Sequence, residues 1–235
     1  MTITNMKPQT KYAIVTLNQS IDLLEKQWEI ALTEAFFPSK LPLIYRGDHV
    51  CKIYNGHAIH TFKAINDMYF DNVSKLVAYL QQKCFSRNEM DIAYIDNKII
   101  IKSKHPKAWV YFDTKIAYVL GVVAKTKIQN DISHTTDISG GIYNIYLYTD
   151  IIEPQYVGDV KAPLLKTIGI DHSSENTHVI YENPYYLSIP PRQLMTICLD
   201  ARNLTGEPLR FPRYSYIYFT LHFRIKPINI TTTNK

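Results

Sequence analysis

"YNIYLYTDIIEPQYVGDVKAPLLKTIGI" occupies Tyr143–Ile170 and contains two extended runs with a short polar segment between them. In the first run Tyr146 and Tyr148 stand two residues apart, and side chains at this spacing lie on one face of a strand. The second run, APLLKTIGI, is aliphatic. Gly158 and Asp159, between the runs, form either a corner of a β-structure or part of a chemical site.

The regions on both sides of this stretch are also extended. Lys11–Leu17 is typical of a strand, and in Trp28–Pro38 apolar residues alternate with polar or small ones, as in a half-buried strand. Further runs are THVIYENPYYLSI, QLMTICLDA and YSYIYFTLHFRI, separated by Pro, Gly, Asn and Asp. Extended runs spaced by about 8 to 15 residues indicate an antiparallel sandwich or barrel rather than β-α-β units.

Two segments follow the helical period instead. The apolar residues of Asn72–Cys84 fall on one stripe, with Asp71 or Asn72 available as the N-cap. Thr114–Leu120 is a shorter helix that Gly121 ends. Both are expected to be short insertions in a β-rich fold.

A hairpin is expected between these helices. Ile92–Ile95 and Lys98–Lys102 are short apolar strands, and the Asp96-Asn97 pair between them is typical of a turn. The run AWVYF that follows is a further extended piece.

No repeat or low-complexity linker marks a domain boundary. We therefore expect one domain over residues 1–235. The ends, residues 1–10 and 226–235, are polar and have few large apolar side chains, so they are expected to be flexible tails.

The composition argues against several classes of protein. With 8 glycines in 235 residues and no Gly-rich fingerprint, a phosphate-binding loop is not expected. The net charge of +5 is dispersed, so nucleic-acid contact is not indicated beyond this weak positive charge. No apolar run approaches the length of a membrane span, and no secretory signal is expected. The wide spacing of Cys51, Cys84 and Cys198 predicts no disulfide framework and is typical of a reducing compartment.

The residues that could support chemistry do not form a convincing set. A zinc site would use His57 and His60 with His49 or Cys51, but the spacing fits no zinc pattern, and on a strand the first two would point to opposite faces. Cys198 lies in an apolar strand pattern and is expected in the core. We predict no catalytic residue, no metal ligand and no cofactor, and the chain is not expected to be an enzyme.

Two tyrosine clusters leave a binding role open. They are Tyr143, Tyr146 and Tyr148, and then Tyr214, Tyr216, Tyr218 and Phe219. Such rings can stack on bases or sugars, but tyrosines two residues apart more often make one face of a sheet.

Five segments, in this order, resemble the minor capsid proteins of Polinton (Maverick) elements and adintoviruses. The most specific is Y-x-D-I-[IV]-x-P-Q-x-V-G-D, followed at the right distance by the ending T-L-H-F-R. The segments are Gln27–Pro38, Phe112–Val122, Tyr146–Ile168, Pro184–Phe211 and Phe219–Arg224.

This resemblance implies a single jelly-roll β-sandwich of two antiparallel sheets and about eight strands. It also implies a penton protein, five copies of which form the capsomer at each vertex of an icosahedral capsid, beside a double jelly-roll major capsid protein. The expected location is the virion, after assembly inside the host cell. Pro154, Gly158 and Asp159 are then structural turn residues rather than catalysts, since glycine permits a sharp turn and Asp159 can bond the turn's amides. The resemblance also implies that Trp28, Leu221 and Phe223 are core or strand residues of the matched segments.

Two other classes remain as alternatives. A β-sandwich carbohydrate- or protein-binding module would need a ligand pocket, and an enzyme on a β-scaffold would need a converging acid–base set. The sequence presents neither, so the structural role is the main expectation.

Overall fold

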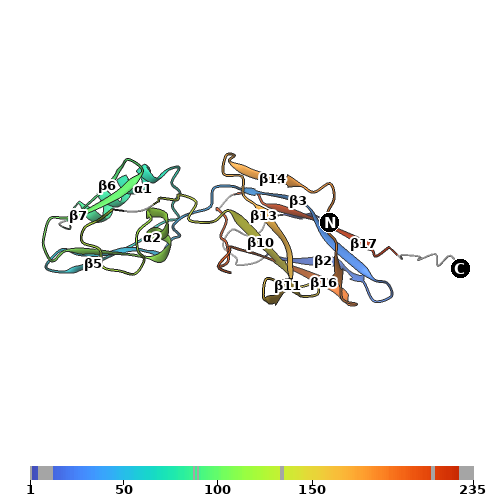
Figure 1. Cartoon of the computed structure of the whole chain (residues 1–235). Coiled ribbons are helices and arrows are strands. Elements are labelled where there is room, and N and C mark those ends of the chain that lie inside the picture. The colour runs from blue at the N-terminus through green and yellow to red at the C-terminus, as the bar shows by residue number, and fades with distance from the viewer. Residues whose placement is uncertain are drawn as a thin grey trace. The chain divides into compact units, whose positions relative to one another are not determined.

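The described chain folds into two units, each rich in antiparallel strands. The structure is a computed structural model that describes residues 2–4, 13–86, 88, 90–132, 135–212 and 215–227 (Figure 1). The first unit lies within Met1–Lys40 and Asn144–Lys235, and the second is Leu41–Tyr143. This division differs from the one domain expected over residues 1–235. The segment 41–143 contains enough inward-facing apolar residues for a core of its own. No linker of distinctive composition marks its two ends in the sequence.

The first unit is a jelly roll. Its strands are, in chain order, β2 (Ala13–Asp22), β3 (Trp28–Pro38), β10 (Asn144–Thr149), β11 (Gln155–Val157), β12 (Val160–Ala162), β13 (Leu164–Gly169), β14 (Asn176–Ile180) and β16 (Gln193–Arg202). The outermost strands of this series pair with each other, as do the next pairs inward: β2 with β16, β3 with β14, β10 with β13, and β11 with β12. Nested antiparallel pairing of this kind defines a jelly roll. The predicted fold class is therefore confirmed.

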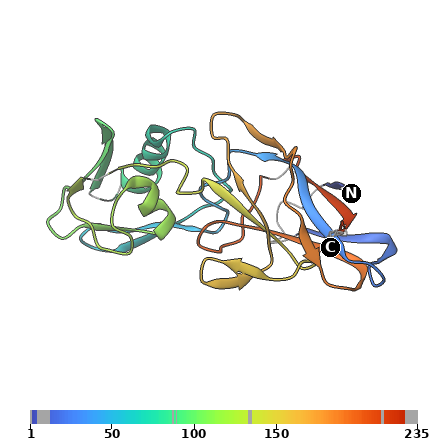
Figure 2. The ribbon, with the colours of Figure 1, turned by 45° about the vertical axis from the view of Figure 1, so that its right-hand side comes forward.

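Two main sheets result from this pairing. One has the order β13-β10-β16-β2. The other has the order β1-β17-β3-β14, with β1 (Thr2–Thr4), β17 (Tyr218–Ile225) and β15 (Leu187–Ile189) added to the jelly-roll series. Figures 1 and 2 show these two layers, and the β11–β12 pair as a separate ribbon beside them.

The inner faces of the two sheets form the first core. Each fully buried leucine, isoleucine or phenylalanine contributes about 1.5–3 kcal/mol by leaving water. Buried members from both sheets include Ile30, Leu32, Phe37, Ile145, Leu147, Ile197, Leu199, Phe219 and Leu221.

A β-bulge in β3 decides which side chains reach solvent. Leu32 pairs with Leu221 and Glu34 pairs with Thr220, so Thr33 is an extra residue on β3. An extra residue reverses the facing of everything beyond it. Without the bulge, the alternation that places Leu32 inside would also place Glu34 inside. With it, the buried residue is Ala35 and Glu34 turns outward.

The run THVIYENPYYLSI, expected as one extended stretch, is divided into β14 and β15. Both pair with β3, β14 along Glu34–Pro38 and β15 along Trp28–Ile30. Pro184 lies in the interruption, where its missing amide proton does not weaken the ladder.

The ends of the chain are described only in part. Residues 2–4 of the expected N-terminal tail pair with β17 as β1. Residues 1 and 5–10, and residues 228–235 of the expected C-terminal tail, lie outside the described residues.

The second unit has two three-stranded sheets and both helices. One sheet has the order β5-β4-β8, from Ile59–Lys63, His49–Tyr54 and Trp109–Phe112. The other has the order β6-β7-β9, from Met90–Ile95, Lys98–Ser103 and Asp131–Ile132. Their core is a separate hydrophobic cluster that includes Ile53, Leu80, Phe85, Val110, Phe112 and Leu120.

The helices agree with the sequence predictions. α1 (Val73–Leu80) continues as a π-helical turn, η1 (Gln81–Phe85). The side chain of Asn72 caps the N-terminus of α1 by accepting a hydrogen bond from the amide of Lys75. α2 (Thr114–Leu120) ends at Gly121, which has a left-handed backbone. The capping and stripe patterns were therefore sufficient to place both helices.

The predicted hairpin between the helices is β6–β7. Asp96 and Asn97 both have positive φ, at 52° and 60°, and Ile95 pairs with Lys98 on either side of them. Positive φ at both turn positions is typical of a type I′ turn, which matches the twist of the strands.

Candidate functional site

The outer face of the β17-β3-β14 sheet carries the densest group of polar and aromatic side chains that we find in the first unit. We call it the jelly-roll face. Its residues are Glu29, Glu34, Phe36, His178, Tyr186, Tyr216, Tyr218, Thr220, His222 and Arg224.

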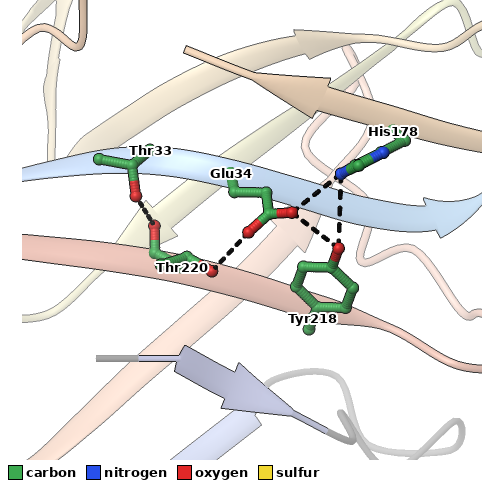
Figure 3. A network of polar contacts seen from close by, with 5 residues as sticks. All are labelled: Thr33, Glu34, His178, Tyr218 and Thr220. Carbon is green, nitrogen blue, oxygen red and sulfur yellow. Dashed lines mark hydrogen bonds and ion pairs between the residues drawn. The ribbon is translucent and has the colours of Figure 1, made fainter. Parts of the chain in front are cut away.

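The carboxylate of Glu34 lies at the centre of one network on this face (Figure 3). Its Oε1 accepts a hydrogen bond from the hydroxyl of Tyr218 at 2.8 Å and lies 2.9 Å from Nε2 of His178. Its Oε2 accepts a 3.2 Å bond from Thr220. The three partners come from β14 and β17, on the two sides of β3, so the network joins all three strands.

Aromatic rings extend this network across the sheet. In register, Phe36 lies directly between His178 and Tyr218. Its ring stacks on that of Tyr218 at 5.4 Å and 6°, and His178 meets it edge-on at 5.7 Å. Tyr216 adds a T-shaped contact with Tyr218 at 5.6 Å. Tyrosine and phenylalanine in such an arrangement supply rigid, amphipathic surface, which suits a contact with another macromolecule.

The network also stabilises the ionised form of Glu34 and the neutral form of Tyr218. Hydrogen bonds from His178 and then Tyr218 lower the pKa of Glu34 below its ordinary value, against a smaller opposing effect of burial. The same bond to Glu34 raises the pKa of Tyr218. At neutral pH the face therefore presents an ionised carboxylate and a phenol that remains a donor.

A second cluster lies on the same face. Arg224 pairs with Glu29 in register, and its Nε and Nη2 each lie 3.0 Å from Oε2 of that carboxylate. The guanidinium also sits 3.4 Å from the ring centre of Tyr186, whose hydroxyl lies 2.6 Å from Nδ1 of His222. Glu29 is only 8% exposed, so Arg224 compensates a charge that water hardly reaches.

The question raised by Gly158 and Asp159 has a structural answer. They form the two-residue turn of the β11–β12 hairpin, in which Val157 pairs with Val160. Gly158 has φ of +64°, and Asp159 is not among the residues of positive φ. Glycine at the first turn position with this geometry is typical of a type II′ turn. Among the described residues, Asp159 makes no hydrogen bond to the turn amides, so the bond expected of it is not present.

The other residues of the matched motifs lie in or beside the sheets. Pro154 precedes β11 directly. Trp28 begins β3 and pairs with both Ile189 and Ile225. In β17, Leu221 is buried in the core and Phe223 is half-buried.

The residues considered for zinc do not converge. His57 and His60 are exposed, and the ring of His57 lies 5.9 Å from that of His105. Cys51 is buried in the second core, where a hydrogen bond with Cys84, and then burial, raise its pKa well above the ordinary value. Within the described part of the chain, no group of three or more His, Cys, Asp or Glu residues could hold a metal ion.

Cys198 corrects one expectation. We predicted it in the core, but its neighbours Ile197 and Leu199 point inward, and Cys198 is half-buried on the opposite side of β16. Its amide donates a 2.9 Å bond to Asp150. The apolar run QLMTICLDA hid this alternation, because the small Cys198 fits either face.

The centre of the jelly-roll face was not found from the sequence. The Tyr216–Tyr218 spacing predicted a tyrosine face, and these rings do contact each other. Glu34 and His178 gave no signal, since their proximity depends on strand pairing across 144 positions of sequence and on the bulge at Thr33.

Comparisons with known proteins give structural matches of low identity. No protein-family model matches the chain, and no curated protein matches it. The chain is similar to the crystal structure of the selenomethionine-labelled penton protein of mavirus, with 11% identity, a TM-score of 0.46, and coverage of 92% of this chain and 91% of that one. It is also similar to a chain in the cryo-electron microscopy structure of the Sputnik virophage, with 10% identity, a TM-score of 0.46, and coverage of 96% and 97%.

None of the helices in the described residues combines the length and the apolar character that crossing a bilayer requires.

Proposed function

We propose that this chain is a penton-type minor capsid protein of a Polinton-like virus or transposon, and that it works by assembly rather than catalysis. Five copies would form a ring at each five-fold vertex of an icosahedral capsid. Their neighbours would be double jelly-roll major capsid proteins, and the site of function would be the virion.

One observation carries this proposal: four of the five segments that resemble Polinton minor capsid proteins build the jelly roll, and the fifth, Phe112–Val122, lies in the second unit. Gln27–Pro38 contains β3, Tyr146–Ile168 runs from β10 into β13, Pro184–Phe211 contains β15 and β16, and Phe219–Arg224 lies in β17. Four segments far apart in sequence thus pair with one another in two sheets. A jelly roll by itself hosts many functions, so the matched segments and not the fold alone support the capsid role.

We further propose that the jelly-roll face is one of the two flanks through which neighbouring copies meet. In a ring, each copy buries one flank against a different flank of the next, and the contacts close when the rotation divides the circle. The jelly-roll face suits such a contact because its charges are already paired and its rings are partly exposed. Contacts of this kind commonly bury on the order of 2,000 Å².

Light scattering over a concentration series tests this interface. Ile180 lies on the face beside Glu34 and is 65% exposed, so Ile180→Arg adds bulk without disturbing the core. We expect the wild-type chain to approach the mass of five copies as concentration rises and I180R to remain monomeric.

The matched control is Ile65→Arg, at an 81% exposed position in the second unit. It should assemble like the wild type. Equal assembly of I180R and the wild type would refute the interface, and a wild-type plateau at two or three copies would refute the pentamer.

A further inference from the structure

The second unit has a sheet face of a different kind, which we call the basic sheet face. In the β5-β4-β8 sheet, one outward row is Thr61, Lys52 and Tyr111, and the next is Ile59, Tyr54 and Trp109. The alternate residues of the same strands, such as Ile53 and Val110, are buried in the second core. Lys127 completes the face, because the bridge between Val110 and Ile128 brings its segment beside β8.

Both lysines of this face lie over aromatic rings. Nζ of Lys127 is 4.8 Å from the ring centre of Trp109, and Nζ of Lys52 is 5.9 Å from that of Tyr111. Cation–π attraction holds each ammonium group above a ring at the surface. Since Tyr111 and Trp109 are two residues apart on one strand, the two charges stand side by side on one face.

The elements that build this face contain no acidic residue of their own. The strands HVCKIY, IHTFK and WVYF, and the segment KTKIQ at 125–129, contain no Asp or Glu. Lys104, another exposed lysine of the unit, does have a carboxylate partner, Asp91. For Lys52 and Lys127 the described residues provide no ion pair. The face is therefore complementary to an anion from outside the chain.

We propose that the basic sheet face binds an acidic polysaccharide, a chain of sugar rings bearing sulfate or carboxylate groups. The ammonium groups of Lys52 and Lys127 would pair with the acidic substituents. The exposed side chain of Ile59 and the ring of Tyr54 would lie against the apolar C–H faces of the sugars. This binding function is separate from assembly through the jelly-roll face.

Other anionic partners fit the geometry less well. Single-stranded nucleic acid binds by stacking its bases on open aromatic faces, but lysines already cover the rings of Trp109 and Tyr111. An acidic peptide that adds to a sheet pairs with the main chain of an edge strand. The basic sheet face instead offers side chains across the breadth of a sheet, against which a chain of sugars can lie.

Binding of the full chain to dextran sulfate, with uncharged dextran as the reference, tests this proposal. We expect saturable binding to dextran sulfate alone. The double variant K52Q/K127Q should bind about tenfold more weakly, as two surface ion pairs of roughly 0.7 kcal/mol each would give. The matched control K98Q/K102Q removes the same charge from exposed positions on β7 and should bind within about twofold of the wild type.

Further probes distinguish the outcomes. Folding of each variant is checked by its thermal melting curve, and oligo(dT) and poly-glutamate are measured beside dextran sulfate. Equal loss in K52Q/K127Q and K98Q/K102Q would mean general charge attraction and would overturn the proposal. Tighter binding of oligo(dT) or poly-glutamate than of dextran sulfate, or unchanged binding by K52Q/K127Q, would also overturn it.

Discussion

The outer faces of two sheets in this protein differ in whether their charged side chains have partners of opposite charge. On the jelly-roll face each acid has a partner from a neighbouring strand, Glu34 with His178 and Glu29 with Arg224. On the basic sheet face, Lys52 and Lys127 rest on rings and find no acid among the described residues. Charges that are already paired cost less to cover with another protein surface than unpaired charges would, whereas unpaired lysines attract an external anion. The first face is therefore suited to assembly and the second to ligand binding.

Loss of the arginine on the jelly-roll face should have the largest effect on stability. Arg224→Ala leaves the 8% exposed carboxylate of Glu29 without its cation. Since Arg224 is itself partly exposed, we expect the free energy of unfolding to fall by about 2 kcal/mol, less than for a fully buried pair. Urea denaturation measures this change.

A double variant checks the cause. In Glu29→Gln/Arg224→Ala no buried charge remains, so the loss should be smaller than that of Arg224→Ala alone. If the loss of unfolding free energy in the double variant equals the sum of the losses in E29Q and R224A, the two residues do not act as a pair.

Removal of the phenol that donates to Glu34 should have a smaller effect. Tyr218→Phe keeps the ring that stacks on Phe36 but loses the 2.8 Å bond. We expect a measurable loss of stability, smaller than that of R224A, since a hydrogen bond to a charged group is strong but this one is near solvent. Tyr216→Phe is the control, because no hydrogen bond of its hydroxyl is present among the described residues, and it should change the stability by less than about 0.5 kcal/mol. Equal losses in the two variants would contradict the role of the Glu34 network.

The dependence of stability on acid pH also distinguishes the two faces. The pKa of Glu34 is lowered in the folded chain by its bonds to His178 and Tyr218. Its stabilising contribution is therefore present above the ordinary pKa of 4.5 and is lost as the pH falls through the lowered value. In Glu34→Gln, the free energy of unfolding should decline less steeply below pH 4.5 than in the wild type, as measured by urea denaturation at each pH. Lys52→Gln should keep the wild-type slope, and an unchanged slope in E34Q would count against the network.

The smallest effect is expected on the basic sheet face. Lys127→Gln removes an exposed cation–π contact with Trp109, which contributes about 0.5 kcal/mol. The free energy of unfolding should therefore change little, although the same residue matters for polysaccharide binding. A loss above about 1.5 kcal/mol would indicate that Lys127 supports the fold and would weaken the contrast between the faces.

The sequence predicted what depends on neighbouring residues. The caps and apolar stripes located both helices, and Asp96-Asn97 located a turn. Alternation in Trp28–Pro38 predicted a strand, but it did not reveal the bulge at Thr33, because that bulge depends on the pairing of β3 with β17.

Long-range features were therefore missed. Residues 41–143 pair among themselves and make a compact unit that the sequence did not mark. The Glu34–His178 contact joins strands that only the jelly-roll topology brings together.

Electron microscopy of the concentrated, negatively stained full chain tests the central claim most directly, because it shows the symmetry of the assembly. The account predicts rings whose class averages have five-fold symmetry, and that these rings are absent for Ile180→Arg. Particles of two-fold or three-fold symmetry, or single copies at every concentration at which light scattering reports association, would contradict it.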